Sequence, residues 1–257
     1  MKKEEAIMFT PQTQRVLKLL FKFRFITALG LANVMGIRRY SVYEVLDKLV
    51  KSGHVIKVYD IAWKIDRKPA YYYLSKEGVT AVRQIMGVKE SKVNSLYRND
   101  TASQSLIQQS LTTLKCYTPI KQSLPQEAEV FTIPELNGYK QFPKKRPDLY
   151  ISTPDGQEAM VFILADAAPF VVRKRLDEIL THFEDEGWDG DYPRVAFILK
   201  DNSAKSSFLF YEASRLEEMG LDEDEFVLMA ASQDDILNDQ PNPWASVYRP
   251  KRTMALF

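Results

Sequence analysis

Apolar residues in the first fifth of the chain recur at helical spacing and predict three helices. Thr10-Pro11 is a helix-start signal, since a hydroxyl cap is followed by proline at the first helical position. We expect helices over residues 10–24, 27–35 and 38–52, with Gly36 and Gly53 ending the second and third. The inward stripe of the third helix is Val42, Val45, Leu46 and Leu49. Three helices with a glycine turn before the third outline a helix-turn-helix.

The pattern then changes to strands. HVIKVYDIAW (residues 54–63) and AYYYLS (residues 70–75) are rich in β-branched and aromatic residues and predict two strands joined by KIDRKP. A further helix is expected from Ser75 to Gly87, with Val79 and Val82 inward. The hairpin next to the third helix predicts a winged helix-turn-helix domain over residues 1–90, with the side chains of Tyr71, Tyr72 and Tyr73 at least partly in its core.

A polar stretch and an alternating α/β pattern follow. Residues 91–127 predict a connecting helix, capped by Asp100 or Thr101, and a linker. Residues 128–257 predict a small α/β domain with a proline-rich tail from Asn238. Strands are expected at residues 129–133, 148–152, 160–165, 194–199 and 226–230, and helices at residues 170–186 and 203–219. The inward residues of the first of these helices are expected to be Val171, Leu176, Ile179, Leu180 and Phe183.

The charge is divided between the two halves of the chain. Of 257 residues, 45% are hydrophobic and 27% charged, as in an ordinary globular protein, and the net charge is +1. Residues 1–115 hold 20 lysines and arginines against 9 acidic residues, whereas residues 116–257 hold 15 against 25. The first half is therefore at +11 and the second at −10. A basic half attracts polyanions such as nucleic acid, so the first half is the candidate binding region.

The third helix and the hairpin tip carry the candidate DNA-binding residues. An arginine donates two hydrogen bonds to a guanine edge, while tyrosine and serine hydroxyls and lysines hold phosphates. The residues are Arg38, Arg39, Tyr40, Ser41, Tyr43 and Lys48 on the helix, and Lys64, Arg67 and Lys68 near the tip. Glu44 and Asp47 on the same helix weaken the charge argument. Two alternatives stay open, a merely solvated helix face and a winged helix that contacts protein.

No motif for a cofactor, a metal or a catalytic group stands out. Cys116 is the one cysteine and His54 and His182 are the two histidines, so no internal disulfide and no zinc site of Cys and His is expected. No phosphate-cradling glycine loop and no catalytic triad occurs. The acidic runs EDEGWDGD and LDEDEF lack the ligand spacing of a calcium loop. Without an apolar segment long enough for a membrane span or a signal peptide, the expected location is the cytoplasm.

Three stretches resemble the replication-relaxation family of plasmid and mobile-element proteins. They are TPQTQRVLKLLFKFRFITALGLANVMG at residues 10–36, RPDLYI before a hairpin and VFILAD after it. The resemblance covers roughly residues 9–229 and consists of hydrophobic patterns. It implies a DNA-binding accessory role in plasmid replication, conjugative transfer or transcriptional control. It also implies a second domain similar to the restriction-endonuclease fold. A relaxase or replication initiator is the candidate protein partner of the acidic domain. The connecting helix is a candidate dimerisation element, so a homodimer is a candidate assembly.

That fold raises the alternative of a metal-dependent nuclease. Such nucleases place Pro-Asp ahead of a strand that bears an acidic residue, a spacer and a lysine, and Pro147-Asp148 matches the first element. The second departs from it, because Leu164-Ala165-Asp166 stands where the family shows Glu-x-Asp and no lysine follows in register. Asp148 and Asp166 alone would ligate a metal weakly, and Glu158 is the remaining candidate ligand. We therefore expect a double-stranded-DNA-binding protein that is not an enzyme.

Overall fold

The computed structural model describes residues 9–65 and 67–257, without the side chain of Lys64. Lys64 is one of the predicted DNA-binding residues, and its side chain thus lies outside the described part of the chain. The chain divides into two compact units, Met1–Leu114 (unit 1) and Lys115–Phe257 (unit 2). The division falls within the long helix α6, Gln104–Ser123.

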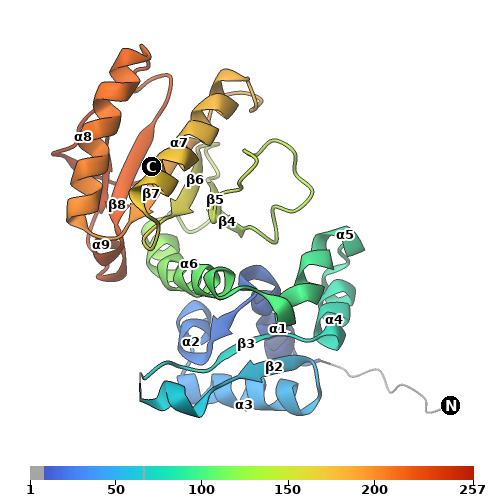
Figure 1. Ribbon diagram of the computed structural model, residues 1–257. Helices are drawn as coiled ribbons and strands as arrows, with labels where there is room; N and C mark the ends of the chain where they lie inside the picture. Colours follow the sequence, from blue (N-terminus) through green and yellow to red (C-terminus); the bar gives the residue numbers. More distant parts are fainter. Residues whose placement is uncertain (1–8, 66) are drawn as a thin grey trace. The chain divides into compact units, whose positions relative to one another are not determined.

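Unit 1 has the topology of a winged helix-turn-helix (Figure 1). Its small antiparallel sheet has the strand order β1-β3-β2, and α3 contacts β2. The helices are α1 (Pro11–Phe23), α2 (Ala28–Met35), α3 (Arg39–Lys51), α4 (Lys76–Met86), α5 (Glu90–Val93) and the 3-10 helix η2 (Asn94–Thr101), and the strands are β1 (Ile26–Thr27), β2 (Val55–Val58) and β3 (Tyr71–Leu74). The predicted order of helices, turn and hairpin is confirmed.

The helix signals in the sequence act as they were expected to. The Thr10 hydroxyl accepts a hydrogen bond from the Thr13 amide at 3.2 Å, and the Thr27 hydroxyl accepts one from the Gly30 amide at 3.1 Å. Gly36 ends α2 with φ +67°, a left-handed conformation that glycine adopts without steric cost. The turn between α2 and α3 is therefore set by local chemistry.

The first strand of the hairpin is shorter than expected. We predicted a strand through Trp63, but β2 ends at Val58 and Ile61–Lys64 forms a 3-10 helix, η1. The Asp60 carboxylate caps this turn by accepting from the Ala62 amide at 2.9 Å, and the Trp63 ring stacks on Tyr71 with centroids 5.7 Å apart. A side chain that accepts a hydrogen bond from a backbone amide two residues later competes with strand pairing. The apolar pattern of this segment did not reveal that competition.

The start of the connecting helix also differs from the prediction. Asp100 and Thr101 belong to η2, and α6 is capped by Ser103, whose hydroxyl accepts from the Leu106 amide at 3.3 Å. Arg24, which follows α1, fixes η2 by donating from Nη2 to Asn99 Oδ1 at 2.8 Å and to the Ser95 carbonyl at 3.0 Å. These hydrogen bonds join residues more than 70 positions apart in the chain, so no pattern of neighbouring residues could predict them.

Unit 2 contains a seven-stranded mixed sheet with the order β10-β9-β8-β7-β6-β5-β4. Strands β6, β7 and β8 are parallel and the outer pairs antiparallel. The strands are β4 (Glu129–Thr132), β5 (Leu149–Ser152), β6 (Glu158–Ile163), β7 (Arg194–Leu199), β8 (Leu228–Ser232), β9 (Trp244–Ser246) and β10 (Thr253–Met254). The helices are α7 (Pro169–Glu184), α8 (Asn202–Glu218) and α9 (Gln233–Leu237).

Alternate residues of the central strands pack into two cores. Phe162 and Phe197 lie in the core with residues of α7 and α8, whereas Val161 and Ala196 lie in the core with Ile236 of α9 and the end of α6. Figure 1 shows α7 and α8 side by side along this sheet. The two-sided burial explains why the predicted strands read as continuous apolar runs.

Three expectations for unit 2 are corrected. On α7 the buried valine is Val172, and Val171 is only half-buried, because Val172 lies one turn before Leu176 on the face that packs into the core. The strand expected at residues 226–230 is β8, two residues later. The proline-rich tail is not outside the fold, since β9 and β10 extend the sheet and Trp244 is 1% exposed.

Candidate nucleic-acid interface

The amino end of α3 has exposed cations and lacks a side-chain cap. Arg38 occupies the cap position with extended backbone, and its side chain makes no cap hydrogen bond to α3. An arginine side chain cannot accept a hydrogen bond, so the cap residue leaves the first-turn amides and the positive end of the helix dipole without a side-chain acceptor. Arg38, Arg39 and Tyr40 are exposed, Tyr40 to 73%. This end of α3 therefore combines backbone donors with two guanidinium groups, which is the chemistry that binds phosphate.

Arg39 is held in place by Tyr43, one helical turn further on. Its Nε and Nη2 donate to the Tyr43 hydroxyl at 3.2 and 2.6 Å, and its guanidinium carbon lies 5.2 Å from the centre of the Tyr43 ring. The Nε–Nη2 edge of the fork is thus occupied. Arg39 would contact a base or phosphate through its other edge, or by exchanging the tyrosine hydroxyl for it.

The later turns of α3 carry both acidic and basic side chains on their exposed face. Val42, Val45, Leu46 and Leu49 are buried, as predicted. Ser41 and Tyr43 are half-buried, and Lys48 is exposed together with Glu44 and Asp47. These two carboxylates repel phosphate in the second and third turns, so the favourable contact surface is the first turn. The side chains of Ser41 and Tyr43 reach solvent only in part.

Tyr72 of β3 lies beneath this surface and was not predicted to matter for it. Its side chain is fully buried, and its hydroxyl has no hydrogen-bond partner within the described chain. Burial raises its pKa to about 12, with the charges of Tyr43 and Asp47 acting in the same direction and Arg39 opposing them. The phenol thus stays neutral and interacts electrostatically with Arg39, Tyr43 and Asp47 of α3. The run of three tyrosines was a signal for core packing, and all three are buried.

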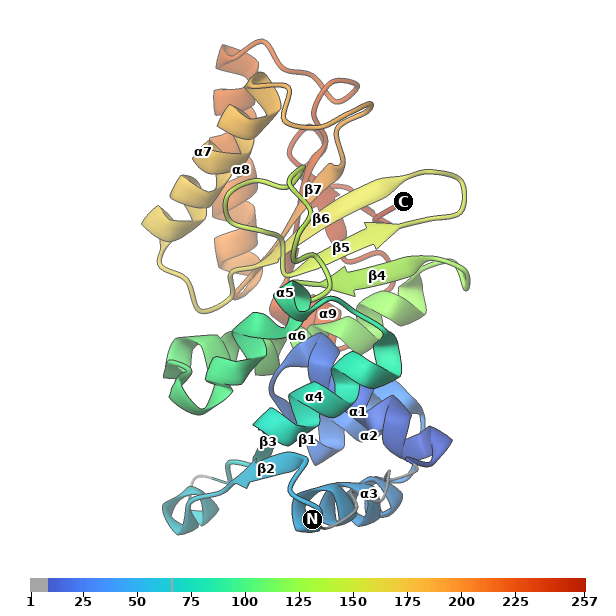
Figure 2. The same cartoon turned by 90° about the vertical axis from the view of Figure 1, so that its right-hand side faces the viewer.

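The hairpin tip presents the other predicted cations. Arg67 and Lys68 are exposed, and Arg67 has φ +53°, a turn conformation that is uncommon for a residue with a side chain. The Lys68 amide donates to the Trp63 carbonyl at 3.0 Å, which closes the turn around η1. Figures 1 and 2 show η1 and α3 at the same end of unit 1. The two groups of predicted residues are therefore brought to one end of this unit.

The three carboxylates considered for a metal in unit 2 differ in their surroundings. Asp148 is 7% exposed, and its Oδ2 accepts from the Ile163 amide at 2.8 Å. Glu158 begins β6, opposite Ser152, and accepts from the Tyr150 hydroxyl, while Asp166 is exposed in the turn that follows this strand. Within the described residues, no three His, Cys, Asp or Glu side chains form a group that could hold a metal ion.

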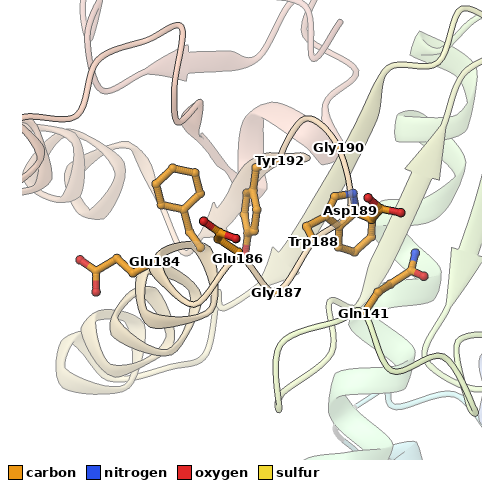
Figure 3. A pocket seen from close by; sticks show the side chains of 9 residues that line it. Gln141, Glu184, Glu186, Gly187, Trp188, Asp189, Gly190 and Tyr192 are labelled. Atoms are coloured by element: carbon orange, nitrogen blue, oxygen red, sulfur yellow. The ribbon is translucent and has the colours of Figure 1, made fainter.

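Unit 2 also contains an open pocket of about 830 Å³ between the end of α7 and the loop that follows it (Figure 3). It is lined by Gln141, Phe183, Glu184, Glu186, Gly187, Trp188, Asp189, Gly190 and Tyr192. Beneath it, His182 Nδ1 lies 2.9 Å from the Tyr192 hydroxyl, and burial lowers the His182 pKa. The lining has three carboxylates and no lysine or arginine, so a phosphate would meet repulsion there. This pocket is unsuited to nucleic acid.

No helix in the described part of the chain is both long and apolar enough to cross a membrane.

Comparisons with known proteins give weak similarity only. No protein-family model and no curated protein matches the chain. The adhesin competence repressor AdcR from Streptococcus pyogenes is 19% identical over 40% of this chain and 75% of its own, with a TM-score of 0.28. A MarR variant from E. coli, complexed with operator DNA, is 19% identical over 46% of this chain and 77% of its own, with a TM-score of 0.29. These scores carry no argument, and the assignment of unit 1 to the winged helices rests on its own topology.

Proposed function

We propose that the chain binds double-stranded DNA through unit 1, with the first turn of α3 in the major groove and the hairpin tip against the neighbouring backbone. One observation carries this proposal: α3, whose first turn exposes Arg38 and Arg39, lies at the same end of the unit as the η1 turn, which the exposed Arg67 and Lys68 follow in the chain. The net charge of +11 over residues 1–115 supports it. Such a charge steers a domain to a polyanion and anchors it there.

The biological setting of this proposal follows from the resemblance to the replication-relaxation family. We infer that the protein is an accessory factor in replication, conjugative transfer or transcriptional control of a plasmid or mobile element. A relaxase or a replication initiator is the partner class for the acidic unit 2, and a homodimer is the proposed assembly. Isolation of the DNA fragments that the purified protein retains from its host's DNA tests this setting, since enrichment of an origin or a transfer region is the expected outcome.

We further propose that unit 2 is not catalytic. This proposal is supported by the hydrogen bonding of Asp148, the buried member of the three candidate metal ligands. Its carboxylate already accepts a hydrogen bond from a backbone amide inside the sheet. Glu158 is engaged by Tyr150 at the far end of β6. A phosphodiesterase with metal chemistry needs several oxygen ligands converging on one point.

The DNA-binding proposal predicts the effect of removing both arginines at the start of α3. Arg38→Ala with Arg39→Ala should weaken binding to a fluorescein-labelled duplex about 5- to 100-fold if either reads a base edge, and should lower the salt slope by about one unit for each lost phosphate contact. Fluorescence anisotropy at several salt concentrations measures both quantities. Both side chains are exposed, so folding should be unaffected.

Lys144 and Lys145 provide a matched control, since they are adjacent exposed cations in unit 2. Their replacement by alanine should leave the affinity and the salt slope as in the unaltered protein. An equal loss of affinity in both variants would show that binding follows total charge, and it would remove the assignment to α3.

A further inference from the structure

Two large aliphatic side chains project from the hairpin tip. Ile61 is 82% exposed and Ile65 is 87% exposed, and Tyr59 beside them is 47% exposed. Burying an isoleucine side chain stabilises a fold, and a single exposed one is common on protein surfaces. Two of them within five residues, at the outermost turn of a hairpin, form an apolar point that the fold of unit 1 does not cover.

Local structure keeps these side chains outward. The η1 turn is closed by hydrogen bonds from the Trp63 amide to the Asp60 carbonyl at 3.0 Å and from the Ile65 amide to the Ala62 carbonyl at 3.2 Å. Trp63 is the residue of this turn that packs inward, against Tyr71. The Trp63 indole is anchored on the sheet. Ile61 is the first residue of η1 and Ile65 follows its last residue, and both side chains lie on the solvent side of the turn.

The charged residues near this point are mostly basic. Lys57 on β2 and Arg67 and Lys68 after the turn are exposed cations. The described carboxylate nearest in sequence, Asp60, is engaged as the cap of η1. Residues 57–68 hold four basic and two acidic residues, a net charge of +2. An apolar point in a net-basic segment matches a polyanion that offers an apolar interior between its charged edges, as stacked base pairs do between phosphates.

We propose that Ile61 and Ile65 act as a wedge that inserts between base pairs from the minor groove and bends the duplex. The inference rests on the proposed DNA binding and adds its mode. Apolar side chains inserted at a base step partly unstack it and kink the helix, while the cations beside them hold the flanking phosphates. Flexible pyrimidine–purine steps are the easiest to open, so the wedge would give sequence preference without hydrogen bonds to bases.

Stretching a single tethered duplex of mixed sequence tests the wedge independently of binding. At saturation the full chain should lower the apparent persistence length of the duplex about twofold from the value of about 50 nm for free DNA. Ile61→Ser with Ile65→Ser should keep the anisotropy salt slope, because no cation is lost, and should leave the persistence length close to that of free DNA. Leu237→Ser, at a 42% exposed leucine of unit 2, should behave like the unaltered protein.

The failures of the two proposals are distinguishable. If the unaltered chain gives no anisotropy change with duplex at low salt, the DNA-binding proposal fails and the wedge fails with it. If it binds but leaves the duplex as stiff as before, or if the double serine variant softens it equally, the wedge alone is overturned. Sedimentation without DNA tests whether the isoleucines contact a second copy of the chain instead. If the unaltered protein is a dimer and the double serine variant is a monomer, the isoleucines belong to a protein contact and the wedge is overturned.

Discussion

At the scale of single residues, side-chain partners decide which predicted site residues are available. Arg39 is already bonded to Tyr43 on its own helix, whereas Tyr40 stands in solvent at 73% exposure. The Asp148 carboxylate has a structural use between two strands, and Asp166 is exposed. Residue type suggested chemistry for each of these, but only the partners separate a group that is available to a ligand from one that stabilises the fold.

Replacing the two candidate metal ligands should therefore have different effects. Asp148→Ala removes the acceptor of the buried Ile163 amide and should lower the free energy of unfolding by about 1–3 kcal/mol. Asp166→Ala, at an exposed position, should change it by less than about 0.5 kcal/mol. Urea denaturation followed by circular dichroism measures both.

The same proteins report on catalysis. Supercoiled plasmid incubated with the unaltered chain and Mg²⁺ or Mn²⁺ should stay intact. Nicking that Asp148→Ala abolishes, in a variant that is still folded, would instead show that unit 2 is a nuclease.

At the scale of secondary structure elements, local capping defines the helices and one cap joins two parts of the winged helix. The Ser75 hydroxyl accepts from the Gly78 amide at 3.0 Å at the start of α4, and it donates to the Gly53 carbonyl at 2.6 Å just after α3. Gly78 lies so close to that segment that a Cβ would meet the His54 carbonyl oxygen at 2.0 Å. The start of α4 is thereby fixed to the turn that leads from α3 into β2.

Loss of this cap should destabilise unit 1 more than an exposed cap does. Ser75→Ala should cost about 1–2 kcal/mol, since a cap bond and a second buried hydrogen bond are removed together. Thr10→Ala, at the exposed cap of α1, should cost about 0.5–1 kcal/mol. Thermal unfolding of the two variants compares them, and equal losses would show that the bond to Gly53 adds nothing.

At the scale of the whole molecule, charge is separated along the chain even though the total is close to zero. Residues 1–115 are at +11 and residues 116–257 at −10, and the net charge is +1. Local potential, and not net charge, governs contact with a charged surface when ions screen beyond roughly 10 Å. We therefore expect each half of the chain to be attracted to surfaces of the opposite charge.

This separation predicts behaviour on ion exchangers. At neutral pH and low ionic strength the chain should be retained both on a heparin or other anionic resin, through unit 1, and on a cationic resin, through unit 2, and moderate salt should elute it from each. Elution profiles on the two resins are the measurement. Passage through both at low salt would show that the opposite charges neutralise each other within the molecule.

The sequence alone determined the elements whose signals are local. Cap residues, the glycine after α2 and the helical stripe of α3 predicted the helix-turn-helix, and continuous apolar runs predicted β6 and β7, because these patterns depend on residues a few positions apart. It also placed the exposed cations at the start of α3.

Tertiary structure decided everything that depends on distant partners. The bond from Arg24 to Asn99, the tail strands β9 and β10 and the bond from Asp148 to the Ile163 amide all join residues that the chain separates. Such contacts gain their free energy from burial and hydrogen bonding in the folded chain, and no nearby residue signals them. The same holds for the exposure of Ile61 and Ile65, since an apolar residue is known to be uncovered only once the rest of the fold is in place.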